Sequence, residues 1–310
     1  FPVRSMAASP DGKWFVVGTE HDGYVRQYSL RGAQPGTYTI AHRGAVQGLA
    51  VSPDGRYVAT AGSDKTITVL DTQVTQPGTT QWQAVTRTDV GVDALCVGFS
   101  PSGDTLYLGT AGDLRAYPFA AGRVTPVTRW TVRNLYMVMS LAPSPDGRFV
   151  AFSQWAKSAH AVDAARGTRV AEVTGLDDQP DGVSWVDGTR VATGTEGGTL
   201  YVWDVSLGAG AKPVQVARHD SRLTALAALG PSTVVYAATW AGPLRFIDVR
   251  NPSVQWAIPS HMDENVKAIV VSKAAATAVT GGDHGSVILW DVVTAPTRPA
   301  GTSAPTTGPR

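Results

Sequence analysis

A short turn signature recurs four times in the first half of the chain and constrains its fold more than any other feature. The copies are Ser9-Pro10-Asp11-Gly12, Ser52-Pro53-Asp54-Gly55, Ser100-Pro101-Ser102-Gly103 and Ser144-Pro145-Asp146-Gly147. Successive serines lie 43, 48 and 44 residues apart. In such a turn the proline pre-sets φ at the second position, and the glycine accepts backbone angles that a larger residue would resist. A repeat of this period indicates one small supersecondary unit that is used several times.

The same register continues through the second half of the chain. Further turns fall where the next copies are expected, at Asp187-Gly188, Gly230-Pro231-Ser232 and Ser272-Lys273. In the clearest unit, turn residues separate three runs rich in apolar and β-branched residues, at 45–51, 57–62 and 66–71. Such patterning is typical of half-buried antiparallel strands, and a weaker fourth run lies in the connecting stretch, as at 36–41. We therefore predict an all-β chain of seven units, each a four-stranded antiparallel sheet.

The second unit resembles a repeat of the WD-repeat family of β-propellers. It has Ala41-His42 before its first strand and Asp71 at its close. Two other units close with the pair that gives the family its name, Trp203-Asp204 and Trp290-Asp291. The similarity covers residues 1–294. It implies that these residues form one domain, a seven-bladed β-propeller whose blades surround a central channel.

The resemblance also implies a hydrogen-bonded tetrad in each blade, made of a histidine, a serine or threonine, an aspartate and a tryptophan. No unit carries all four residues at the family's positions. Unit two has the first three, with leucine in place of tryptophan: His42, Thr60, Asp64 and Leu70. Unit seven has histidine at the aspartate position: His261, Thr280, His284 and Trp290. Unit six keeps only the histidine, His219. We expect blades that are held mainly by apolar packing.

Composition argues against several classes of function. Charged residues make up 16% of the chain and the formal net charge is +1, so no broad attraction to nucleic acid or anionic membrane is expected. No run approaches 18 apolar residues, and we predict no membrane span. Cys96 is the only cysteine, which excludes an internal disulfide and indicates a buried, inert thiol in a cytoplasmic protein. Because the chain begins at Phe1, an upstream targeting segment is neither seen nor excluded.

The last residues, 295–310, are rich in proline, threonine, alanine and glycine and lack apolar periodicity. This composition is typical of a tail or linker. The chain starts directly on an inner strand, so the last blade needs an outer strand from elsewhere. We predict that the C-terminal residues just past Val293 supply it, because proline is tolerated on an edge strand; a segment upstream of Phe1 is the alternative.

The resemblance places partner contacts on the loop face around the channel. The residue before the turn aspartate and the residues at the start of each inner strand point onto this face in the family. The candidate partner-binding residues are Trp155, Trp240, Met137, Met139, Arg4, Arg222, Lys267, Asn265 and His21. Exposed tryptophan and methionine are frequent in interface hot spots, although Trp155 and Trp240 could instead pack between blades. The other strand tryptophans are predicted to be core: Trp14, Trp185, Trp203, Trp256 and Trp290.

These residues favour a non-catalytic scaffold that binds a partner protein or peptide. One alternative is recognition of a charged ligand or phosphopeptide by Arg4, Arg222 and Lys267, because arginine suits phosphate geometry. The other is a hydrolase with a metal ion in the channel, for which only Asp93 and Asn265 offer oxygen ligands, too few for a hard cation. Nucleophile-elbow, phosphate-loop and zinc-helix motifs are absent. We therefore predict no catalytic residue, metal, cofactor or small-molecule substrate.

Overall fold

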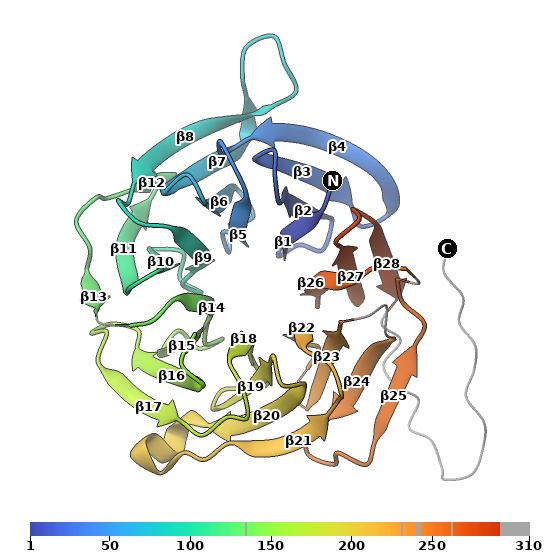
Figure 1. Cartoon of the computed structure of the whole chain (residues 1–310). Coiled ribbons are helices and arrows are strands. Elements are labelled where there is room, and N and C mark those ends of the chain that lie inside the picture. The colour runs from blue at the N-terminus through green and yellow to red at the C-terminus, as the bar shows by residue number, and fades with distance from the viewer. Residues whose placement is uncertain (134, 231, 240–242, 262, 292–310) are drawn as a thin grey trace.

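Seven antiparallel sheets stand around a central axis in the computed structural model (Figure 1), which describes residues 1–133, 135–230, 232–239, 243–261 and 263–291. In each blade the strands follow chain order from the axis to the rim. The chain is therefore the all-β seven-bladed β-propeller that the repeat predicts.

The strands of the first four blades have the following bounds. Blade 1 contains β1 (Val3–Ala8), β2 (Trp14–Thr19), β3 (Tyr24–Ser29) and β4 (Gly32–Ile40), and blade 2 contains β5 (Val46–Val51), β6 (Tyr57–Gly62), β7 (Thr66–Thr75) and β8 (Trp82–Asp89). Blade 3 contains β9 (Ala94–Phe99), β10 (Thr105–Thr110), β11 (Leu114–Ala120), β12 (Arg123–Val124) and β13 (Trp130–Val132). Blade 4 contains β14 (Val138–Pro143), β15 (Phe149–Gln154), β16 (Ser158–Asp163) and β17 (Arg169–Val173).

The last three blades continue this order. Blade 5 contains β18 (Pro180–Trp185), β19 (Arg190–Thr195), β20 (Thr199–Asp204) and β21 (Val214–Arg218), with the short 3-10 helix η1 (Val205–Gly210) before β21. Blade 6 contains β22 (Leu223–Ala228), β23 (Thr233–Ala238), β24 (Leu244–Asp248) and β25 (Gln255–Ile258), and blade 7 contains β26 (Val266–Ser272), β27 (Thr277–Gly282) and β28 (Val287–Asp291).

Two blades depart from the four-stranded plan. In blade 3 the outer strand is broken into β12 and β13, which both pair with β11. Blade 7 shows three strands within the described residues. The outer strand that we predicted for it, from the C-terminal tail, falls outside the part of the chain that the structure describes.

The repeated turn signature owes its residue types to one local geometry. Each signature serine is buried, and its hydroxyl oxygen accepts a hydrogen bond from the backbone N–H five residues on, as from Tyr57 to Ser52 at 2.8 Å. The glycine has a positive φ in all four copies, +73° at Gly55. Gly55 also faces Pro10 of the preceding blade, so the turns of blades 1 and 2 meet on this face of the ring.

We expect the change Gly55→Ala to lower the free energy of unfolding by about 1 kcal/mol, since a left-handed backbone costs that much for a residue with a Cβ. The nearest atom to the added methyl would be Pro10 Cδ at 3.8 Å, an ordinary contact, so the cost is conformational. Gly112, which lacks a positive φ and has open surroundings, provides the control: Gly112→Ala should leave stability equal or slightly higher. Thermal unfolding of both variants measures the difference, and equal melting temperatures would contradict this account of the turn.

The core lies between neighbouring blades. One cluster, for example, joins Ile67 and Tyr57 of blade 2 to Phe99, Leu106 and Phe119 of blade 3. Strands β6 and β10 are buried along their whole length. Each blade therefore buries its apolar faces against its neighbours, and the ring gains stability through these interfaces.

Blades 2 and 6 have the incomplete tetrads that the sequence predicts. In blade 2, His42 lies 2.9 Å from Asp64 Oδ1 and 2.7 Å from Thr60 Oγ1, and the fully buried Leu70 stands at the tryptophan position. In blade 6, His219 lies 2.8 Å from the hydroxyl of Tyr236.

The expectation of an incomplete tetrad is wrong for blade 7. His261 lies 2.8 Å from Thr280 Oγ1, and the indole N–H of Trp290 donates to the same hydroxyl at 2.8 Å. The missing carboxylate comes from Glu264, whose Oε1 lies 2.9 Å from His261 Nδ1. Glu264 lies in the segment between His261 and β26, so that segment replaces the turn aspartate.

The predicted core tryptophans divide into three groups. Trp203 and Trp185 are buried, and Trp14 and Trp290 are half-buried. The prediction is wrong for Trp256, which is 36% exposed on the rim strand β25 and stacks on Phe246. β25 is the outermost strand of blade 6, at the rim, where less of the described chain surrounds a side chain than on the inner strands.

Candidate functional site

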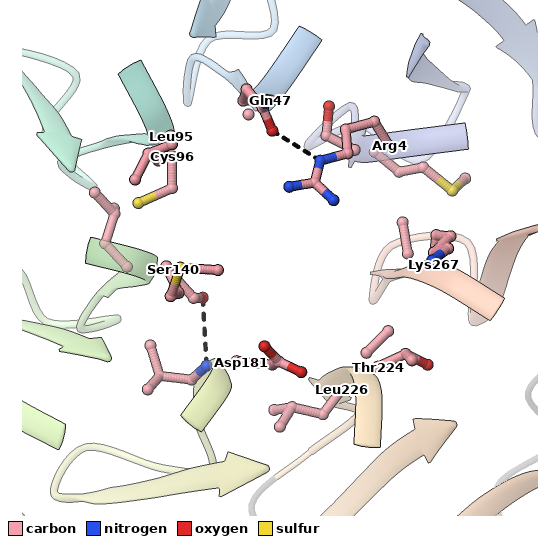
Figure 2. A pocket seen from close by; sticks show the side chains of 18 of the residues that line it. Arg4, Gln47, Leu95, Cys96, Ser140, Asp181, Thr224, Leu226 and Lys267 are labelled. Carbon is pink, nitrogen blue, oxygen red and sulfur yellow. Dashed lines mark hydrogen bonds between the residues drawn. The ribbon is translucent and has the colours of Figure 1, made fainter. Parts of the chain in front are cut away.

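The inner strand of every blade breaks its pairing register after its first residue. Each break displaces the second residue of the strand, and a β-bulge of this kind re-aims a side chain. The displaced residues are Arg4, Gln47, Leu95, Met139, Asp181, Thr224 and Lys267. All seven line one cavity of about 590 Å³ on the axis of the ring (Figure 2). We call this ring of residues the channel mouth.

The structure brings some of the predicted partner-binding residues together and places others elsewhere. Arg4, Met137, Met139, Arg222 and Lys267 line the cavity, together with Asp93. Asn265 does not line it; its side-chain N–H donates to Asp283 Oδ2 at 2.8 Å. His21 is exposed between β2 and β3. Trp240 falls outside the described residues.

Arg222 is held by carboxylates of blade 5. Its Nε and one terminal nitrogen donate to the two oxygens of Asp181 at 2.5 and 2.8 Å, and another terminal nitrogen lies 3.0 Å from Glu196 Oε1. Burial raises the pKa of Asp181, and the neighbouring guanidinium opposes that shift. Arg222 therefore differs from Arg4 and Lys267, with which the sequence grouped it, because its charge is already matched.

Asp181 is a site residue that the sequence prediction missed. The signal was its position, since it is the second residue of its inner strand, as are Arg4 and Lys267. The same position in blades 1, 4 and 7 holds the predicted residues Arg4, Met139 and Lys267, so position could have identified Asp181 as well.

The two cations of the channel mouth, Arg4 and Lys267, form no ion pair with a carboxylate within the described residues. Arg4 is exposed, and its Nε donates to the side-chain oxygen of Gln47 at 2.8 Å (Figure 2). Lys267 is half-buried on β26, the strand that packs beside β1. Burial raises the pKa of Asp283, but the hydrogen bonds from Asn265 and the positive charge of Lys267 lower it by more, so the pKa of Asp283 is lowered overall. Arg4 and Lys267 are thus the two cations of the channel mouth, and the nearby carboxylate of Asp283 offsets part of the charge of Lys267.

Two exposed aromatic residues and two methionines lie on blade 4, the blade that stands across the ring from blades 1 and 7 (Figure 1). The aromatic residues are Tyr136, which is 66% exposed, and Trp155, which is 44% exposed. Trp155 lies in the turn between β15 and β16, and its backbone N–H donates to the carbonyl of Met137 at 3.0 Å. The methionines, Met137 and Met139, line the cavity. We call these four residues the blade 4 patch; the sequence prediction missed Tyr136, whose signal was an aromatic residue just before an inner strand.

The titratable groups near the axis are held in place by local bonds. Cys96, which we predicted to be buried, is half-buried and lines the cavity. Its thiol donates to the carbonyl oxygen of Val138 at 3.4 Å, and desolvation raises its pKa to about 12. Within the described chain, Glu264, Asp283 and His284 place potential metal ligands within 4.8 Å of one another. Both carboxylates already accept hydrogen bonds, from the backbone N–H of His284 and from Asn265, which gives them a structural role.

No described helix is long and apolar enough to span a membrane. The cytoplasmic location stays a prediction. A comparison with protein families finds that the family model for the WD domain, G-beta repeat, matches residues 1–29 and 34–71. The two ranges cover β1 to β3 and then the chain from β4 to the aspartate in β7, so they hold two successive copies of the repeat.

Proposed function

We propose, from the premise that this chain is a WD-repeat β-propeller, that it is a non-catalytic scaffold which binds a partner protein or peptide at the channel mouth. The observation that carries the proposal is the blade 4 patch, where Tyr136 and Trp155 are exposed beside a cavity lined by all seven blades. Loops presented by a rigid scaffold commonly hold binding residues, and neighbouring repeats join their loops into one surface.

The exposed aromatic side chains provide the binding energy in this proposal. Tyrosine and tryptophan bury a large area with few rotatable bonds, and such residues dominate interface hot spots. The turn that carries Trp155 joins the paired strands β15 and β16, so little order has to be gained there when a partner binds. The methionines beside them adapt their shape to an apolar side chain of the partner.

A peptide-display selection on the immobilised ring tests this function. Peptides enriched from a random library should bind the ring about 30-fold more weakly after Trp155→Ala, because loss of a hot-spot residue costs about 2 kcal/mol. Tyr136→Ala should act in the same direction. Binding constants come from calorimetry with the selected peptides.

Two exposed aromatic residues on the rim provide matched controls. Trp256 is 36% and Tyr38 is 48% exposed, on β25 and β4. Trp256→Ala and Tyr38→Ala should keep peptide affinity, and Trp155→Ala should keep the melting temperature. The proposal would be overturned if the selection enriched no peptide, or if peptides bound the patch variants and the rim variants alike. A large fall in melting temperature on Trp155→Ala would show a packing role instead.

A further inference from the structure

We propose that the bound segment carries an acidic residue, held between Arg4 and Lys267, together with an apolar residue on the blade 4 patch. This inference rests on the proposed function and names the chemistry of the partner. It follows from the distribution of charge around the channel mouth.

The two cations are placed to share one anion. Arg4 and Lys267 occupy equivalent bulge positions on β1 and β26, which pack side by side, and both line the same cavity (Figure 2). The bond to Gln47 uses Arg4 Nε and leaves its terminal nitrogens without a protein partner in the described chain. Lys267 has neither an ion pair nor a hydrogen bond with any described residue. A carboxylate or phosphate oxygen would complete the hydrogen bonding of both groups.

The remaining charges orient the ligand. Arg222 is matched by Asp181 and Glu196. Asp93, exposed on the blade 3 side of the cavity, repels an anion there. The carboxylate of Asp283 offsets part of the charge of Lys267, and that of Asp181 part of the charge of Arg4. An acidic group is still favoured beside Arg4 and Lys267 over the rest of the mouth, which directs the apolar part of the segment toward blade 4.

The size of the cavity agrees with a side chain as the occupant. Its volume of about 590 Å³ lies within the range of small-molecule pockets. One or two side chains of a peptide fit this space, whereas the body of a folded partner stays outside it. In such a partly enclosed mouth, screening by solvent is reduced and a charged hydrogen bond strengthens.

Paired changes in peptide and ring test the inference. A selected peptide with its acidic residue changed from glutamate to glutamine should bind about tenfold more weakly, since hydrogen bonds between charged groups are the stronger class. Lys267→Gln should weaken the glutamate peptide to a similar extent and leave the glutamine peptide unaffected. Lys13→Gln removes the same charge from the opposite face, where Lys13 pairs with Asp11, and should leave both affinities unchanged.

A peptide with phosphoserine at the acidic position distinguishes the two sources of the anion. Tighter binding than the glutamate peptide, again lost with Lys267→Gln, identifies a phosphate group as the natural ligand; equal or weaker binding identifies a carboxylate. Selected peptides that need Trp155 but contain no acidic residue and ignore both Lys267→Gln and Arg4→Gln would overturn the inference while the proposed function stands. Peptides that ignore Trp155 would instead count against the proposed function.

Discussion

The change Trp203→Ala lowers the free energy of unfolding by about 3–5 kcal/mol, the usual cost of removing a large buried aromatic side chain. Trp203 is 1% exposed and packs in the cluster between blades 4 and 5, with Trp185. Its indole N–H donates to the buried hydroxyl of Thr193 at 2.9 Å. Truncation therefore leaves a cavity and removes a hydrogen-bond donor from a buried oxygen.

Calorimetry measures this effect as a fall in melting temperature on the order of 10 °C. Trp256→Ala is the matched control, because Trp256 is exposed on the rim; its effect should stay within about 1 kcal/mol. Trp203→Phe, which keeps most of the volume and loses the N–H, should fall between the two. Equal effects at positions 203 and 256 would show that the core does not lie between the blades.

The second large effect is a loss of stability at acid pH through His160. This side chain is buried on β16 against the ring of Phe152. Its Nδ1 has no hydrogen-bond partner in the described structure, and the nearest carboxylate oxygen, Glu172 Oε1, lies 3.9 Å away. Burial, helped by the charge of Arg169, lowers the pKa of His160 from 6.5 to about 4. The folded protein therefore keeps the imidazole neutral, while the unfolded chain binds a proton below pH 6.5.

The free energy of unfolding therefore decreases as the pH falls, because the unfolded chain binds the proton more readily than the folded protein does. The contribution of His160 is fully present above pH 6.5, falls as the pH drops, and levels off near pH 4, with a total loss of roughly 3 kcal/mol. Burial also lowers the pKa of His42 and of His219, which adds to the slope, whereas the raised pKa of Asp181 opposes it. Melting temperatures from pH 7 to pH 4 should fall less steeply for His160→Phe than for the unchanged protein. His21→Gln, at an exposed turn histidine, should keep the full slope, and an unchanged slope in His160→Phe would contradict the assignment.

The fold could be predicted because the turns demand particular residues. In each turn the serine hydroxyl accepts a backbone hydrogen bond, the proline presets φ, and the glycine adopts a left-handed conformation. Apolar and polar residues alternate in the strands between the turns, as is typical of half-buried strands. The number of blades followed from the spacing alone. The exposure of Trp256 could not be predicted in this way. Period-two patterning shows which residues share a face of a strand, but it does not show what covers that face.

The site was only partly predictable for a related reason. Positions at the starts of the inner strands were identified, and five of the nine candidates line the cavity. The ion pair between Arg222 and Asp181 joins residues that are 41 positions apart in the chain. The contact of Glu264 with His261 depends on how the segment before β26 folds back. Tertiary contacts of this kind are decided by geometry that no single segment of sequence encodes.

Backbone hydrogen exchange of the unchanged ring, with and without a selected peptide, tests the central claim most directly. We predict slower exchange at residues 135–139 and 154–157 and at the start of β1 and β26, where the blade 4 patch, Arg4 and Lys267 lie. Slower exchange confined to the rim strands, or to the signature turns on the opposite face, would contradict binding at the channel mouth.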